Sequence, residues 1–159
     1  GVTPEAPSLE AVIPSKRVRR VCYGKNERDK VKVKLNTLTS NAIDYVVLGC
    51  PHASFEEIQK ISRLLEGQKI SPSVRFEVWT SWAIRALAER SGDVAAIEAA
   101  GGHVLTDTCP SITRVGAGRR MVTNAVKQAH YIQGMLGHEV AVGTLQDVID
   151  AAISGYWRG

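Results

Sequence analysis

Short apolar runs alternate with stretches of helical periodicity through most of this sequence. The runs end at glycine or polar residues, and most are followed by apolar positions spaced three and four residues apart. Strands covered on both faces read as continuous apolar runs, and strands separated by helices are typical of parallel sheets. The pattern therefore predicts an α/β fold with a doubly wound, mostly parallel sheet flanked by helices. The expected strands cover residues 45–48, 74–79, 103–105, 119–122 and 139–143.

Two of the expected helices begin with a capping box, in which a hydroxyl and a carboxylate three residues later satisfy free backbone N–H groups. Ser54 and Glu57 have this spacing after the first strand, and Thr144 and Asp147 have it after the last. Polar and apolar residues alternate over 74–79, which predicts a strand with one face in solvent.

Residues 1–40 differ from the α/β domain expected at 41–159. They are rich in proline and basic residues, which predicts a loop-rich, basic N-terminal segment. A short helix is expected at 8–12 and a strand at 17–23. Lysine alternates with apolar residues over 30–35, which predicts an edge strand kept soluble by its lysines.

The chain has 159 residues and a net charge of +4, with an ordinary globular share of 44% apolar residues. Nine basic residues lie between Lys16 and Lys34, against only Glu27 and Asp29. Such a cluster can bind nucleic acid or an anionic partner, or it can be a solvated face or a subunit contact. Aromatic residues do not alternate with these charges, which disfavours nucleic acid as a partner.

No apolar run approaches the ~20 residues that a membrane-spanning helix needs, and the N-terminus lacks the pattern of a signal peptide. We therefore expect a cytoplasmic protein without a membrane partner. The chain begins at Gly1 rather than methionine, so we expect a fragment or a processed chain.

The three cysteines, Cys22, Cys50 and Cys109, are too few and too scattered for a disulfide framework, which leaves reduced thiols or metal ligands. Cys50 follows the strand at 45–48, and Cys109 lies in the polar turn after 103–105. Parallel α/β sheets bind ligands at the carboxyl ends of their strands. Thiols from two loops suit an iron–sulfur cluster or another soft metal better than a zinc knuckle, and they need a further ligand. The alternative is that each cysteine is a small buried hydrophobe.

Polar residues around the last expected loops add further candidates. Thr123 and Asn124 at a helix start, with Lys127 one turn on, can bind an anion through free amides, the helix dipole and an ammonium group. Plain helix capping is the alternative. His52 can orient a ligand or shuttle a proton, or it can be an exposed loop histidine. Asp107 is interpreted as a turn former.

Four motifs are similar to the C-terminal half of the catalytic region of the aconitase X family. They occur in the family's order and span nearly the whole chain, although residues 15–40, including Cys22, carry little of the resemblance. The motifs are residues 1–6; residues 49–52 with Ser54 and Glu57; residues 106–109; and Thr123, Asn124 and Lys127 with residues 129–131.

The resemblance implies an aconitase-like fold and a hydro-lyase with an iron–sulfur cluster or iron held by three cysteines. Cys50 and Cys109 correspond to two of them, and the third lies upstream, so the isolated chain is expected to be inactive. Family members dehydrate a small hydroxy acid, either cis-3-hydroxy-L-proline or mevalonate 5-phosphate. Their partners are the remaining catalytic half and a small swivelling domain or subunit that closes the site.

For this chain we expect His52 and Lys127 to act in catalysis, and Thr3, Thr123 and Asn124 to bind the substrate. Removing water from a β-hydroxy acid needs a Lewis acid on the hydroxyl, a base, and fixed cations or amides for the carboxylate.

Two positions depart from the family pattern. Pro110 follows Cys109 where a bulkier apolar residue is expected, and Ala125 follows Asn124 where serine is usual. Lys127 is the one lysine of these motifs that could bind a phosphate, which favours the hydroxyproline branch over a mevalonate 5-phosphate dehydratase subunit. The remaining alternative is a non-catalytic α/β module whose basic segment binds a partner subunit or nucleic acid.

Overall fold

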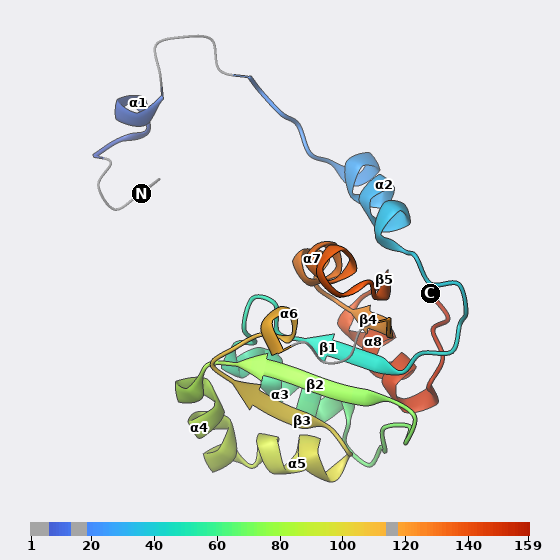
Figure 1. Ribbon diagram of the computed structural model, residues 1–159. Coiled ribbons are helices and arrows are strands. Elements are labelled where there is room, and N and C mark those ends of the chain that lie inside the picture. The colour runs from blue at the N-terminus through green and yellow to red at the C-terminus, as the bar shows by residue number, and fades with distance from the viewer. Residues whose placement is uncertain (1–6, 14–18, 114–117) are drawn as a thin grey trace. The chain divides into compact units, whose positions relative to one another are not determined.

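The computed structural model describes residues 7–13, 19–113 and 118–159 (Figure 1). The chain divides into two units, Gly1–Lys30 and Val31–Gly159. In the first unit, helix α1 (Leu9–Val12) follows Ser8, whose Oγ accepts a hydrogen bond from the Ala11 N–H at 3.3 Å. This bond confirms the short helix expected at 8–12.

The second unit contains a five-stranded sheet in which every pair of neighbouring strands is parallel (Figure 1). The strand order is β3-β2-β1-β4-β5, so the first strand lies in the middle. All five strands were predicted from the sequence, and they are β1 (Tyr45–Leu48), β2 (Arg75–Thr80), β3 (His103–Thr106), β4 (Arg120–Thr123) and β5 (Glu139–Val142).

Helices cover both faces of this sheet, which confirms the doubly wound α/β fold. Val46 and Leu48 of β1 belong to a core shared with α3 (Phe55–Leu64), α5 (Asp93–Ala99) and α8 (Leu145–Ser154). Tyr45 and Val47 belong to a second core on the other face, which includes Ala129 and Ile132 of α7 (Val126–Leu136). Successive strand residues point to opposite faces, so β1 contributes to both cores. Helices α4 (Trp82–Ser91) and α6 (Pro110–Thr113) complete the unit.

Both predicted capping boxes are present at helix starts. The Ser54 Oγ accepts from the Glu57 N–H at 3.2 Å, and the Glu57 carboxylate accepts from the Ser54 N–H at 2.8 Å. Thr144 and Asp147 make the same pair of bonds at the start of α8, at 3.2 and 2.8 Å. Among the helices of the described residues, none has the length and apolar character that a bilayer crossing demands.

The edge strand expected at 30–35 is wrong, because these residues form the second half of helix α2 (Lys25–Leu35). Val31 and Leu35, four residues apart, face the core, whereas Val33 is 77% exposed. Lysine, arginine and glutamate favour helices, and the alternation of two valines with lysine is too short to outweigh them. The strand at 17–23 is also absent from its described residues, 19–23, while residues 17 and 18 lie outside the described part.

The prediction that β2 is half exposed is wrong as well. All residues of β2 after Arg75 are buried, including Glu77 with an exposure of 0%. The Glu77 carboxylate accepts hydrogen bonds from the Tyr45 hydroxyl at 2.6 Å, the Trp79 Nε1 at 3.0 Å and the Arg75 Nε at 2.5 Å. A buried carboxylate with three donors is compatible with the core, and the alternating pattern conceals it.

Candidate functional site

The strand order places the candidate residues at the point where the sheet changes direction. After β1 the chain moves to β2 and β3 on one side, and it then crosses to β4 and β5 on the other. Cys50 follows β1, and Asn124 follows the adjacent β4. In open α/β sheets, ligands bind beside the carboxyl ends of the strands at this switch point.

The loop that carries Cys50 is held against the end of β2. Gly49 has a φ of +89°, and a Cβ atom there would lie 2.0 Å from the Trp79 carbonyl oxygen, so only glycine fits. The Ala53 N–H donates to the Trp79 carbonyl at 2.8 Å, and the Thr80 hydroxyl donates to the Ala53 carbonyl at 2.7 Å. The position of Cys50 therefore depends on β2.

The loop that carries Cys109 is held at the same place. Asp107 has a φ of +61°, a conformation that aspartate tolerates better than most residues. Its N–H donates to the Thr80 carbonyl at 3.3 Å, and its Oδ1 accepts from the Trp82 N–H at 3.2 Å. Cys109 lies directly before α6, and its carbonyl accepts from the Ile112 N–H at 3.0 Å.

The two cysteine loops also contact each other. The His52 Nε2 lies 2.8 Å from the Thr108 carbonyl oxygen, two residues after Cys50 and one before Cys109. His52 is exposed.

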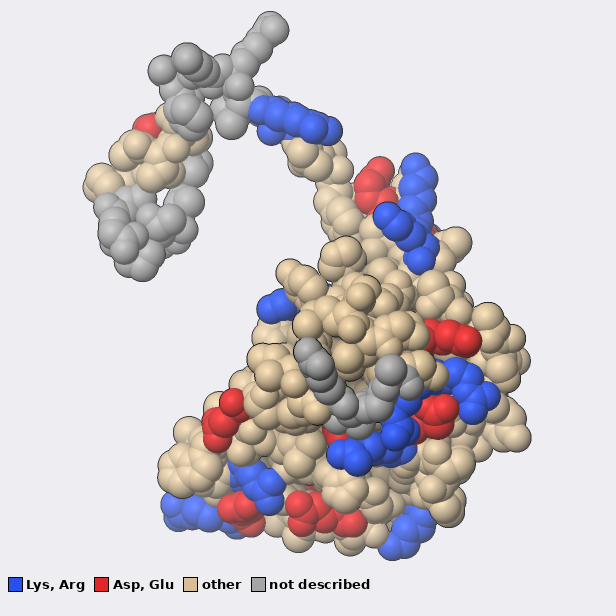
Figure 2. Space-filling view, in the orientation of Figure 1, with Lys and Arg blue, Asp and Glu red and all other residues tan. Residues whose placement is uncertain are grey.

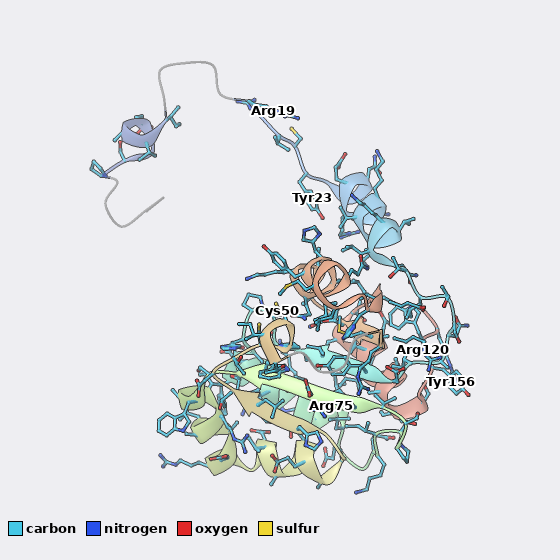
Figure 3. The ribbon with its side chains drawn as sticks, in the orientation of Figure 1. Arg19, Tyr23, Cys50, Arg75, Arg120 and Tyr156 are labelled. Carbon is cyan, nitrogen blue, oxygen red and sulfur yellow. The ribbon has the colours of Figure 1, made fainter. Side chains whose placement is uncertain are left out.

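The two thiols differ from Cys22 in their surroundings. Cys50 and Cys109 are half-buried, whereas Cys22 is exposed. Burial raises the pKa of the Cys50 thiol; the Lys127 ammonium acts to lower this pKa, and a negative charge on Cys109 acts to raise it. Figure 3 shows Cys50 beside α6, the helix that follows Cys109. The structure thus brings Cys50, Cys109 and Lys127 into one electrostatic environment.

The start of α7 differs from the sequence-based expectation. Neither Thr123 nor Asn124 caps it, because the cap position is Ala125, which offers no side-chain hydrogen bond. Thr123 is fully buried in β4, and its Oγ1 accepts from the Ala125 N–H at 3.2 Å. Asn124 and Lys127 are exposed. The helix ends at Gly137, which has a left-handed backbone conformation. Thr3 lies outside the described residues.

The donor set suits a soft metal only in part. Cys50 and Cys109 offer two thiolates on one edge, which fits iron–sulfur chemistry. Within the described part of the chain, no three histidine, cysteine, aspartate or glutamate residues gather closely enough to hold a metal ion. A metal here therefore needs a ligand from outside that part.

Sequence reasoning missed two features of this edge. Thr80 anchors both cysteine loops, and its only sequence signal is a polar residue at the end of a strand. Asp107, expected only as a turn former, also holds the Cys109 loop to Thr80 and Trp82. Large apolar side chains are also exposed in the segments that follow β2, β3 and β4. They are Trp82 (68% exposed), Ile112 (70%) and Val126 (44%), which we call the apolar rim.

This chain is thus a doubly wound α/β domain with two linked cysteine loops at its switch point. Residues 43–154 match the model of the aconitase X third domain. The chain therefore belongs to the aconitase X family.

Two curated relatives and one solved structure illustrate this membership. The chain is 33% identical to the cis-3-hydroxy-L-proline dehydratase of Pseudomonas aeruginosa over 98% of its own length and 28% of that protein's. It is 33% identical to the phosphomevalonate dehydratase large subunit of Methanocaldococcus jannaschii over 84% of its length and 33% of that protein's. The crystal structure of holo aconitase X from Thermococcus kodakaraensis superposes with a TM-score of 0.73 and 25% identity, covering 87% of this chain and 36% of that one. The chain thus spans a third or less of the curated relatives named here.

Proposed function

We propose that this chain is part of an aconitase X-type hydro-lyase that dehydrates a β-hydroxy acid with an iron–sulfur centre or iron. The observation that carries the proposal is the meeting of the Cys50 and Cys109 loops at the switch point, within electrostatic reach of Lys127. The homologues are dehydratases, which agrees with this chemistry.

In this proposal Cys50 and Cys109 hold the metal, together with a ligand from the rest of the full-length protein. When bound, the iron supplies a Lewis acid for the departing hydroxyl group. Because the cap residue Ala125 offers no side-chain acceptor, the first N–H groups of α7 have no side-chain cap among the described residues and can bind an anion, aided by the helix dipole. Lys127 and Asn124 add an ammonium and an amide beside them, so these two residues hold and orient the substrate carboxylate.

The substrate that we propose is cis-3-hydroxy-L-proline. Lys127 is the only lysine or arginine whose charge acts on Cys50 among the described residues, and a phosphate usually takes more than one cation. The second candidate is mevalonate 5-phosphate, because the Methanocaldococcus jannaschii relative is equally identical, although over a smaller share of this chain. Activity assays of the full-length protein with both acids separate the two substrates.

The apolar rim supports a partner at the same edge. Three exposed apolar side chains, each from a segment that follows a strand of this edge, offer a partner apolar surface to cover. We propose that the remaining catalytic part of the enzyme and a small swivelling domain or subunit pack against this rim and exclude water from the site.

Metal analysis of the full-length protein tests the proposal. After anaerobic reconstitution, we expect Cys50→Ser and Cys109→Ser to lose most of the iron and sulfide, because each removes a ligand. The matched control is Cys22→Ser, which changes an exposed thiol and should keep the metal. Unchanged metal content in both site variants would refute the dehydratase proposal. Salt-sensitive binding to DNA or RNA would then favour the non-catalytic alternative.

A further inference from the structure

The two cysteine loops are joined by backbone and side-chain hydrogen bonds that do not involve the thiols. We infer that His52 is a positioning residue that fixes the separation of Cys50 and Cys109, rather than a residue that transfers protons. The inference rests on the proposed function for its metal, but the link itself is a property of this chain.

The carboxyl end of β2 is the common anchor of both loops. Thr80 donates from its hydroxyl to Ala53 in the Cys50 loop, and its carbonyl accepts from Asp107 in the Cys109 loop. Thr80 is fully buried, so water does not compete for these bonds. One residue therefore sets the base of both loops.

His52 joins the loops a second time, next to the cysteines. A backbone carbonyl can only accept a hydrogen bond, so the His52 Nε2 must carry the proton that it shares with Thr108 at 2.8 Å. The two loops are therefore hydrogen-bonded to each other at two places, through Thr80 at their base and through His52 near the thiols. Without His52, the hydrogen bonds that hold the Cys109 loop among the described residues are those of Asp107 and α6.

Metal affinity depends on such supports. Residues that orient metal ligands typically change affinity by 10–100-fold when they are removed. The His52 bond is exposed to water, so we expect its loss to act near the lower end of this range. Glutamine can place an amide N–H close to the position of the His52 Nε2, but it cannot exchange a proton near neutral pH. The two roles of His52 are therefore separable.

The experiment compares His52→Ala and His52→Gln in the full-length protein. Iron release to a chelator is followed in the reconstituted protein, and kcat is measured across pH. In the metal-free protein, the yield of Cys50–Cys109 cross-linking by dibromobimane, a reagent that bridges neighbouring thiols, is measured by mass spectrometry. The matched control is His103→Ala, since His103 is exposed and begins β3 at the opposite end of the sheet.

We expect His52→Ala to release iron about tenfold faster and to cross-link less. His52→Gln and His103→Ala should match the parent protein in both measurements, and His52→Gln should keep its kcat and pH profile. A His52→Gln variant that loses kcat while iron release stays unchanged would overturn the inference in favour of proton transfer. An unchanged cross-linking yield in His52→Ala would also overturn it. Since the cross-linking needs no metal, it tests whether His52 holds the two cysteine loops together even if the dehydratase proposal fails.

Discussion

At the amino half of the sheet the carboxylates of Asp44 and Glu77 are paired with arginine side chains, whereas at the carboxyl edge the thiols of Cys50 and Cys109 are free. Asp44 and Arg120 form an ion pair at 3.3 Å, and Arg75 donates to Glu77. Figure 3 shows Arg75 and Arg120 at the same end of the sheet, and Figure 2 shows basic and acidic side chains side by side there. Half-buried Cys50, by contrast, keeps a thiol that burial makes harder to ionise. Paired groups stabilise a fold, and unpaired ones are available to a ligand.

The same contrast appears between two helices at the carboxyl edge. Helix α8 begins with a complete capping box, while α7 begins at Ala125 without one. Both helices follow strand ends at this edge, so position alone does not explain the difference. The uncapped helix is the one that begins beside Cys50.

The largest expected effect comes from Glu77→Ala in the paired half. Removing a buried carboxylate that accepts three hydrogen bonds should lower the free energy of unfolding by about 3 kcal/mol. Burial and the neighbouring Glu77 raise the pKa of Tyr45, so its hydroxyl stays a donor and is left without this acceptor. Urea denaturation measures the change. Glu89→Ala, which breaks an exposed ion pair with Arg85, should cost only about 0.5 kcal/mol; equal costs would remove the distinction between buried and exposed pairs.

Gly49→Ala tests the backbone that places Cys50. The new Cβ would collide with the Trp79 carbonyl in addition to straining a positive φ, so we expect a loss of about 2 kcal/mol or more and reduced iron content. Gly67→Ala is the matched control, because Gly67 has a φ of +68° but no atom within 4 Å of the place that an added methyl group would occupy. It should cost about 1 kcal/mol and leave the iron unchanged. If both variants behave alike, the close approach to Trp79 has no role.

Thr144→Ala removes the cap of α8 and should cost about 1 kcal/mol by thermal or urea unfolding. Hydrogen bonds from Thr144 lower the pKa of Asp147, so this interaction stabilises the fold above the ordinary pKa of aspartate and is lost as the pH falls through the folded-state pKa. The variant should therefore lose less stability on acidification than the parent protein. A parallel fall in both proteins would contradict this assignment.

Ala125→Asp is the converse experiment at α7. Ala125 already has an extended backbone, so an aspartate there can cap the helix and should stabilise the protein by about 0.5 kcal/mol. The new carboxylate would also occupy the N–H groups that we assign to the substrate and repel an anion. We therefore expect a higher KM in the full-length enzyme, measured by steady-state kinetics. A stabilised variant with an unchanged KM would show that the substrate does not use this helix start.

Lys127→Met should have the smallest effect, a change in thiol reactivity. Removing the ammonium group removes the influence that lowers the pKa of Cys50, so alkylation of Cys50 by iodoacetamide in the metal-free protein should slow at a fixed pH. Mass spectrometry distinguishes Cys50 from Cys22. Lys60→Met on the exposed side of α3 is the control, and equal slowing in both variants would point to a general charge effect.

Local signals in the sequence were sufficient for most of the fold. Tyr45–Leu48 forms a strand, as its short length, its β-branched and aromatic residues and the glycine after it predict, and the capping box of Ser54 and Glu57 locates the next helix. The same reasoning failed at residues 30–35 and at Glu77. In both cases a strict alternation suggested a strand face in solvent. At residues 30–35 the helix propensity of the charged residues outweighed it, and at Glu77 the outcome depended on contacts with distant residues.

The candidate site was predictable only in its parts. That Cys50 and Cys109 lie in loops after strands follows from the sequence, but their approach depends on the strand order and on Thr80, which no local pattern reveals. Ala125 was passed over because a threonine and an asparagine before it looked like better caps. The buried position of Thr123 follows from its place in β4, one residue beyond the expected end of that strand.

The central position of β1 in the sheet also has a consequence for folding during synthesis on the ribosome. Tyr45–Leu48 leaves the ribosome before either of its neighbours, since β2 and β4 both come later in the chain. Until they arrive, an apolar segment with two open backbone edges has nothing to pair with, and such segments are prone to aggregate. Slow synthesis or a shortage of chaperones should therefore harm the yield of this protein more than its final stability suggests.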